Sequence, residues 1–204
     1  MIRLTCATGN PGKLREFRMA AGPESGVEVE LLTGYGQIPP CVEDGSTFEA
    51  NAILKARHYS PHAGGLLFAD DSGLKVDALD GAPGVYSARF AGRDASDAAN
   101  NRLLLEKLRG VSHRYARFVC VIALVEAERL LSVFHGVVEG RITDEPRGRE
   151  GFGYDPLFYY PPLGCTFGEL LLEEKNLRSH RSAAFRLLVD FLRAQYTRTP
   201  AMIE

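Results

Sequence analysis

The stretch LLFADDSG, residues 66–73, places two adjacent carboxylates directly after a run of apolar residues. The run is too short for a helix, and its composition is typical of a buried strand. We therefore predict a strand that ends near Asp70 and Asp71 and brings both side chains to an edge of a sheet. Because neighbouring residues of a strand point to opposite faces, one aspartate can enter a pocket while the other braces the loop.

Two interpretations of this stretch remain open at this point. Paired carboxylates at the end of a strand can hold a hard cation such as Mg²⁺ and orient a water molecule on it. An ordinary polar turn is the alternative, because Asp-Ser-Gly is also a common loop sequence. The rest of the chain has to decide between them.

Length and composition indicate a single domain, or two lobes that share one core. The chain has 204 residues, of which 45% are hydrophobic and 25% charged, so it can bury a sizeable core. Its formal net charge of −2 is too balanced for a protein that coats nucleic acid. We expect residues 1–204 to form one domain with a loose tail after about residue 196.

The cysteine spacing indicates a protein of a reducing compartment, and the apolar runs indicate that it does not span a membrane. Cys6, Cys41, Cys120 and Cys165 lie far apart, with neither a CxxC motif nor a zinc-type spacing. No signal-peptide pattern and no apolar run long enough to span a bilayer is visible. We expect a cytoplasmic protein with no membrane partner and no disulfide framework.

The segment ATGNPGK, residues 7–13, resembles a phosphate cradle. It follows an alternating strand pattern, and Asn10 followed by proline is a strong helix start. The free N–H groups and the dipole of such a helix favour a phosphate, and Lys13 adds charge. Ala7 and Leu14 stand where a P-loop has glycine and Ser/Thr, so the P-loop's metal site is missing. A merely well-capped helix is the alternative.

The segment EDGSTFEANAILKA, residues 43–56, starts a second helix on a carboxylate-bearing loop. Ser46 with Glu49 matches a capping box. Lys55 lies beside the expected apolar stripe and is either a snorkelling surface residue or a phosphate contact. Glu43 is either a metal ligand or a charge that favours the helix start.

Two later segments add an aromatic face and a pair of cations. In GFGYDP, residues 151–156, glycines on both sides of Phe152 allow close backbone approach, and the ring offers a stacking surface. His180 and Arg181 open the last helix, where cations are unfavourable. That position suggests an anionic or acceptor-rich ligand nearby, and the alternative is a solvated turn.

Taken together, the motifs resemble the inosine triphosphate pyrophosphatase family, which acts on noncanonical purine nucleoside triphosphates. Six segments occur in the family's order and cover nearly the whole chain: residues 7–13, 43–56, 69–74 (ADDSGL), 81–92 (GAPGVYSARFAG), 151–158 (GFGYDPLF) and 173–181 with EEKN and SHR. The resemblance implies an α/β fold with a long curved mixed β-sheet flanked by helices, and two lobes with a central substrate groove. It further implies a homodimer that hydrolyses ITP, dITP and XTP to the monophosphate and pyrophosphate, with Mg²⁺ as cofactor.

The resemblance also assigns roles to individual residues. It makes Asp71 the proton acceptor and a metal ligand, Glu43 a second metal contact, and Lys55 the group that neutralises phosphate charge. The substrate-binding residues that it implies are Thr8, Gly9, Asn10, Pro11, Gly12 and Lys13 for the triphosphate, Ser72, and Phe152, Gly153, Tyr154, Asp155, Lys175, His180 and Arg181 for the base and phosphate pocket.

Hydrogen-bond polarity gives a reason for base selection. Hypoxanthine and xanthine present a 6-oxo acceptor to the donors of His180 and Arg181, whereas adenine presents a 6-amino donor. The same argument does not exclude GTP, and the sequence does not rank ITP, dITP and XTP or settle whether Asp70 touches the metal. Other functions with the same motifs are a pyrimidine-directed enzyme, a nucleotide sensor without turnover, and a hydrolase of the terminal phosphate.

Overall fold

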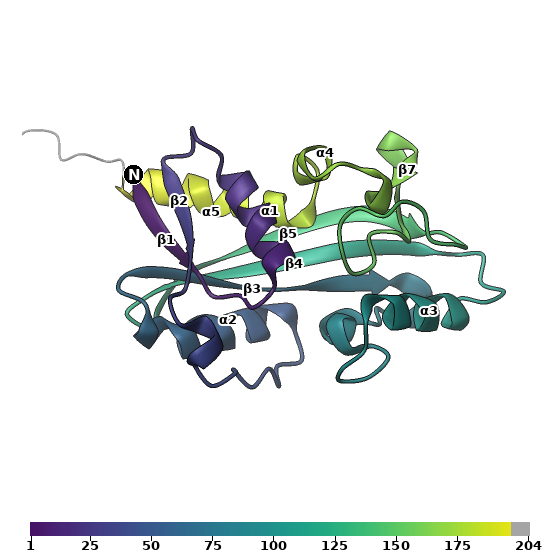
Figure 1. The fold of residues 1–204 in the computed structure, drawn as a ribbon, viewed down its shortest axis with the longest axis horizontal. Helices are drawn as coiled ribbons and strands as arrows, with labels where there is room; N and C mark the ends of the chain where they lie inside the picture. The colour runs from purple at the N-terminus through teal and green to yellow at the C-terminus, as the bar shows by residue number, and fades with distance from the viewer. Residues whose placement is uncertain (197–204) are drawn as a thin grey trace, which may run out of the picture.

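The structure is a computed structural model that describes residues 1–196, and it contains a seven-stranded mixed sheet with helices on both faces (Figure 1). The strand order is β2-β1-β3-β4-β5-β6-β7. The strands are β1 (Ile2–Cys6), β2 (Val27–Leu31), β3 (Leu66–Val76), β4 (Tyr115–Glu126), β5 (Arg129–Ile142), β6 (Phe158–Tyr160) and β7 (Cys165–Thr166). The helices are α1 (Pro11–Ala21), α2 (Phe48–Tyr59), α3 (Asp97–Lys107), α4 (Leu172–Asn176) and α5 (His180–Tyr196). The predicted α/β class is confirmed, while the expected loose tail lies outside the described residues.

The first three strands create a crevice at the carboxyl end of β1. Strand β1 pairs in parallel with β2 on one side and with β3 on the other. The chain therefore crosses β1 between β2 and β3, and in Figure 1 α1 and α2 lie on opposite faces of the sheet. In open α/β sheets, ligands bind in such a crevice beside the point where the strand order reverses.

Strand β3 does not end at the two aspartates, as the sequence predicted, but continues to Val76. It pairs with β4 along its whole length. On its other side β1 pairs with β3 only as far as Phe68 and then leaves the sheet. Asp70 and Asp71 therefore lie within β3, on the side where β1 no longer pairs with it, and not at the end of a strand. This side borders the crevice. Here the ladder with β4 holds their backbone rigid.

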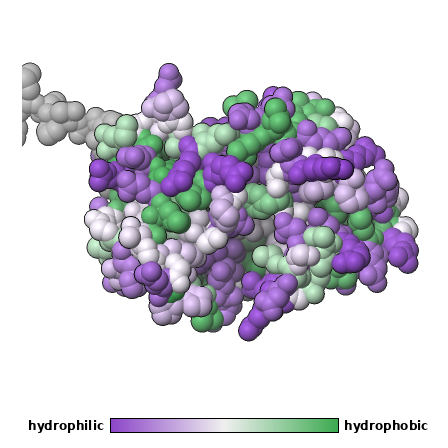
Figure 2. Space-filling model, viewed as in Figure 1, coloured by the Kyte–Doolittle hydropathy of each residue, from purple (hydrophilic) through white to green (hydrophobic). Residues whose placement is uncertain are grey.

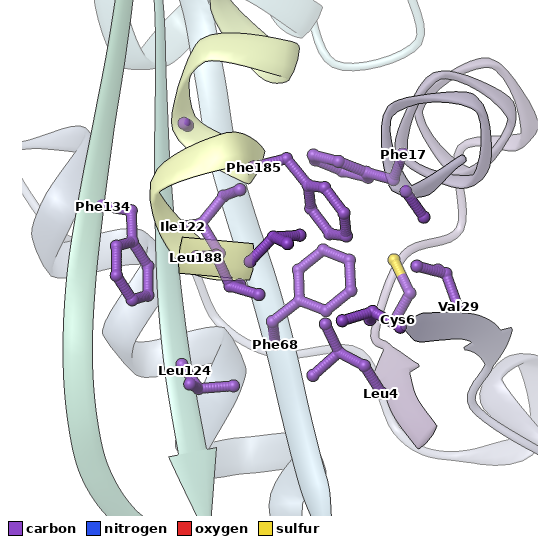
Figure 3. Packing of buried hydrophobic residues seen from close by; sticks show 14 of the residues in the cluster. Leu4, Cys6, Phe17, Val29, Phe68, Ile122, Leu124, Phe134, Phe185 and Leu188 are labelled. Atoms are coloured by element: carbon purple, nitrogen blue, oxygen red, sulfur yellow. The ribbon is translucent and has the colours of Figure 1, made fainter. Parts of the chain in front are cut away.

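A cluster of aromatic rings joins α1, β3 and α5 above the sheet (Figure 3). The centroid of Phe68 lies 5.0 Å from that of Phe17 and 5.7 Å from that of Phe185, and the last two rings are 5.6 Å apart. Edge-to-face and tilted contacts at these distances are favourable for aromatic pairs. The helices that carry the predicted phosphate cradle, His180 and Arg181 are thus fixed to the strand that carries both aspartates.

Helix α2 buries a more polar face than the one that an apolar stripe predicts. Leu54 of α2 is 39% exposed, whereas Asn51 and Lys55 are buried. The inner face of α2 is partly polar because it faces charged groups on β3, and a pattern based on hydrophobicity alone cannot show this.

On the face seen in Figure 2, hydrophobic side chains form small groups among hydrophilic ones. Scattered surface hydrophobic residues of this kind are normal for a folded protein. Among residues 1–196, no helix combines the length and the apolar character that crossing a bilayer requires.

Candidate active site

A cavity of about 280 Å³ lies at the crevice beside β1 and collects most of the predicted site residues. Lys13 from the first helix, Asp71 from the central strand and Arg181 from the last helix all line it. The other predicted residues in its lining are Thr8, Gly9, Asn10, Glu43, Lys55, Ser72, Phe152, Gly153, Tyr154, Asp155 and His180. Groups from both ends and the middle of the chain therefore share one cavity, whereas Pro11, Gly12 and Lys175 do not line it.

The predicted phosphate cradle has the expected backbone geometry. The Asn10 side chain caps α1 by accepting a hydrogen bond from the Lys13 N–H at 3.0 Å, and Pro11 occupies the first position of the helix. Gly12 supports this turn from outside the cavity. A Cβ there would lie 2.8 Å from the Phe152 ring, so only glycine allows that ring to pack against the start of α1.

On one face of the sheet, Asp70 neutralises the cradle lysine. Its carboxylate accepts hydrogen bonds from Lys13 Nζ at 2.8 Å and from Ser72 Oγ at 2.7 Å. Burial alone raises the pKa of Asp70, but the charges of Lys13, Lys55 and Arg181 outweigh it and lower the pKa to about 2. Asp70 is therefore ionised at neutral pH and holds Lys13 at the cavity.

On the other face, Asp71 meets the second predicted lysine. Lys55 Nζ donates to Asp71 Oδ1 at 3.1 Å and to Glu43 Oε2 at 2.8 Å. Burial lowers the pKa of Lys55, but Asp71, Asp70 and Glu43 outweigh it, so the pKa is raised and the ammonium stays charged. Burial raises the pKa of Asp71, and the opposing charge of Lys55 does not cancel this. Asp71 is thus a better proton acceptor than a free aspartate.

His180 forms part of the aromatic wall of the cavity. Its ring stacks on Phe118, with centroids 4.8 Å apart and an interplanar angle of 13°. Both ring nitrogens are buried and have no hydrogen-bond partner within residues 1–196. Burial, together with the charges of Arg181, Lys175 and Lys13, lowers the pKa of His180 well below 6.5. The neutral ring offers one donor and one acceptor, rather than acting only as a donor as the sequence argument assumed.

Glu16 of α1, which the sequence analysis did not select, neutralises the cations of the last segment. It is 1% exposed, and its carboxylate accepts from Arg181 Nη1 at 2.8 Å and from Lys175 Nζ at 2.7 Å. The unfavourable position of Arg181 at a helix start is therefore offset by a carboxylate of the same chain. The only local signal for Glu16 is its position one helical turn after Lys13.

Lys175 lies behind the cavity rather than in its lining. The side chain is 1% exposed, its ammonium also contacts the Asp155 carboxylate, and it lies 4.9 Å from the centroid of the Phe152 ring. It therefore fixes the segment that carries Phe152, and the structure does not place it against a ligand in the cavity.

Two further charged residues, Arg89 and Asp97, line the cavity and were not selected from the sequence. Asp97 accepts a hydrogen bond from the Gly153 N–H at 2.6 Å, and Asn101 donates to the Gly153 carbonyl at 3.0 Å. Two side chains at the start of α3 thus bind both the N–H and the carbonyl of Gly153 and hold the glycine-rich loop in place. Arg89 belongs to the quoted segment 81–92, but nothing in that segment marks this residue over its neighbours.

The neutral state of His180 predicts a loss of stability in mild acid. Below pH 6.5 the unfolded chain gains a proton on this ring that the folded protein does not, so stability falls as pH falls. The His180→Leu variant should lose about 2 kcal/mol less than the wild type between pH 7 and pH 5. Urea unfolding at both pH values measures this difference. The same replacement at exposed His62 is the control.

The match to known proteins covers the part of the chain that contains these motifs. The sequence model of the Ham1 family matches residues 4–191. The chain belongs to the Ham1 family. A relative from an Exiguobacterium species, named dITP/XTP pyrophosphatase, is 51% identical over 187 residues, which cover 92% of this chain and 95% of the relative. A protein of the same name from Yersinia pseudotuberculosis is 48% identical, with coverage of 95% and 99%.

The fold of the family agrees as well. The solved structure of a HAM1 protein from Coxiella burnetii is 43% identical, with a TM-score of 0.84 over 95% of this chain and 100% of that one. The sequence resemblance to the inosine triphosphate pyrophosphatases is thereby confirmed at the level of family and fold.

Proposed function

We propose that this protein hydrolyses the noncanonical purine nucleotides dITP, ITP and XTP to the monophosphate and pyrophosphate, which removes them from the nucleotide pool. The observation that carries the proposal is the single cavity shared by Lys13, the Asp71–Lys55 pair and Arg181. The Ham1 membership supports it, because relatives named dITP/XTP pyrophosphatase match almost the full chain.

The residues divide the reaction among them. The N–H groups at the start of α1 and the Lys13 ammonium bind the phosphates, with Lys13 exchanging the Asp70 carboxylate for phosphate oxygen. Asp71 orients a water molecule and accepts its proton while the water oxygen bonds to the α-phosphorus. The bond from that phosphorus to the bridging oxygen breaks, and pyrophosphate leaves. Lys55 stabilises the negative charge that develops.

The acidic groups fit a magnesium ion that arrives with the nucleotide. Mg²⁺ in nucleotide sites commonly takes one or two carboxylates, with phosphate oxygens and waters completing the shell. Asp71 and Glu43 share the Lys55 ammonium and supply this number, and no group of three metal-binding side chains occurs in residues 1–196. When bound, Mg²⁺ would neutralise phosphate charge and acidify the attacking water.

Metal removal tests this part of the proposal. EDTA should abolish ITP hydrolysis, and added Mg²⁺ should restore it. Glu43→Gln should raise the Mg²⁺ concentration that gives half-maximal rate about tenfold or more, because a carboxylate ligand is lost. Exposed Glu28, which lies on β2, provides the control as Glu28→Gln and should leave the Mg²⁺ titration unchanged. Full activity in EDTA would contradict the magnesium assignment.

Arg181 gives the proposed selectivity for a 6-oxo purine. Arg181 has a buried Nε without a partner in the described chain, and its guanidinium lies 4.8 Å from the Phe152 ring centroid. An adenine amine facing it would leave a buried donor unpaired, which costs roughly 1–3 kcal/mol.

Arg181→Ala should therefore reduce the preference for ITP over ATP, roughly 5- to 150-fold on this energy. The ratio of the two kcat/KM values measures it. Arg178→Ala is the matched control, since Arg178 donates to the Glu174 carbonyl and does not line the cavity. An unchanged ratio in Arg181→Ala would remove this residue from base selection.

One assay separates the proposal from its alternatives. Purified protein should hydrolyse ITP with Mg²⁺ much faster than GTP or ATP and release pyrophosphate. Orthophosphate as the product would indicate cleavage of the terminal phosphate, and tight binding without turnover would indicate a nucleotide sensor. Faster hydrolysis of pyrimidine nucleotides would indicate a pyrimidine-directed enzyme.

We further propose that the protein acts as a homodimer in the cytoplasm, which is what the family resemblance implies. Each chain has a mass of 22.4 kDa, so light scattering during gel filtration should give twice this value. A monomer mass at micromolar concentration would contradict the dimer.

A further inference from the structure

Asn51 is a completely buried side chain of α2 that uses both ends of its amide. Its Oδ1 accepts a hydrogen bond from the Gly45 N–H at 2.8 Å, and its Nδ2 donates to Asp71 Oδ2 at 3.2 Å. The partners define the orientation of the amide, since an N–H group can only donate and an ionised carboxylate can only accept.

The Asp71 carboxylate is therefore held at both oxygens by a single helix. Lys55 Nζ contacts Oδ1, and Asn51, one turn earlier on α2, contacts Oδ2. An ammonium is a compact charge with rotatable donors, so Lys55 attracts the carboxylate without defining its plane. A planar amide anchored at its far end does define that plane.

The anchor of this amide is the loop that carries Glu43. A Cβ on Gly45 would lie 2.6 Å from Asn51 Oδ1 and 2.8 Å from the Cβ of Ala50, so the loop is packed directly onto the start of α2. Glu43 lies two residues before Gly45 and contacts Lys55. The Asn51 side chain thus contacts both the loop that carries Glu43 and the strand that carries Asp71.

We propose that Asn51 is a positioning residue, which sets the orientation of the Asp71 carboxylate and couples it to the loop of Glu43. The inference rests on the proposed function, in which Asp71 accepts the proton of the attacking water. Proton transfer requires the acceptor oxygen within hydrogen-bond reach of the water, so a freely rotating carboxylate is a poorer base. Hydrogen-bond partners that orient a reactive residue typically contribute 10- to 100-fold to activity.

The test uses Asn51→Asp, because this change keeps the shape and the acceptor for Gly45 but turns an oxygen toward Asp71. We expect kcat for ITP to fall about 10- to 100-fold, with KM within about twofold of the wild type. Asn51→Ala is the second variant, and it removes both hydrogen bonds without adding charge. A drop in kcat is expected there too. Calorimetric binding of a non-hydrolysable ITP analogue should be unchanged in both variants.

Thr47→Ala is the matched control for a general loosening of α2. Thr47, and not Ser46 as the sequence suggested, caps this helix by accepting from the Ala50 N–H at 3.1 Å. Its loss destabilises the same element without touching Asp71. Its kcat should equal that of the wild type. The inference is overturned if both Asn51 variants keep kcat within twofold, if the loss falls on KM and analogue affinity, or if Thr47→Ala loses as much kcat. Wild-type protein inert toward ITP would overturn the proposed function itself, and this inference with it.

Discussion

Replacing Asp71 by Asn should lower kcat for ITP by about 10²- to 10⁴-fold, the usual contribution of a general base. Asn has nearly the shape of Asp, but its single amide oxygen can keep the hydrogen bond from either Lys55 or Asn51, which donate to different oxygens of Asp71. An amide cannot accept the proton of the attacking water, because its oxygen is far less basic than a carboxylate. Steady-state hydrolysis of ITP with saturating Mg²⁺ measures the loss.

Nucleotide binding must survive in this variant for the assignment to hold. The phosphate contacts of Lys13 and of the α1 N-terminus lie on other elements, so a non-hydrolysable ITP analogue should still bind. Asp77→Asn is the matched control, since Asp77 pairs with Arg117 away from the cavity. It should have wild-type kcat. If Asp71→Asn retains more than a tenth of the wild-type rate, another group accepts the proton.

The opposite directions of the two aspartates could be predicted from the sequence because they follow from strand geometry alone. Asp70 contacts Lys13 of α1, and Asp71 contacts Lys55 of α2 on the other face of the sheet. The length of β3 could not be predicted in the same way. Its open edge exists because β1 stops pairing at Phe68, and that is a property of two strands more than sixty residues apart.

The capped start of α1 was also predictable, since its capping residue and the backbone that it fixes are neighbours in the chain. The polar inner face of α2 was not, because its residues are buried against charged groups that only the fold brings near. Glu16 shows the same limit most clearly. Its two partners, Lys175 and Arg181, lie 159 and 165 residues away in the sequence.

The buried charges around Glu16 predict the largest effect on stability. Glu16→Leu should lower the free energy of unfolding by about 3–5 kcal/mol, the usual cost of removing one partner from a buried ion pair. The replacement leaves Arg181 without its carboxylate and Lys175 with Asp155 alone. Urea unfolding at pH 7 measures the loss. Glu28 is an exposed residue of β2, and Glu28→Leu is the control, which should change stability by no more than about 0.5 kcal/mol.

In acid, the difference in unfolding free energy between the wild type and Glu16→Leu should become smaller. Burial alone raises the pKa of Glu16, but the charges of Arg181 and Lys175 outweigh it and lower the pKa from 4.5. A carboxyl group whose pKa is lowered in the folded protein stabilises the fold at pH values above its ordinary pKa. This contribution is lost as the pH falls below that ordinary pKa. The gap between wild type and Glu16→Leu should therefore narrow once the pH drops below about 4.5. A gap that stays constant from pH 7 to pH 3 would mean that Glu16 acts through its packing, and that the charge of Arg181 at the cavity is balanced by another group.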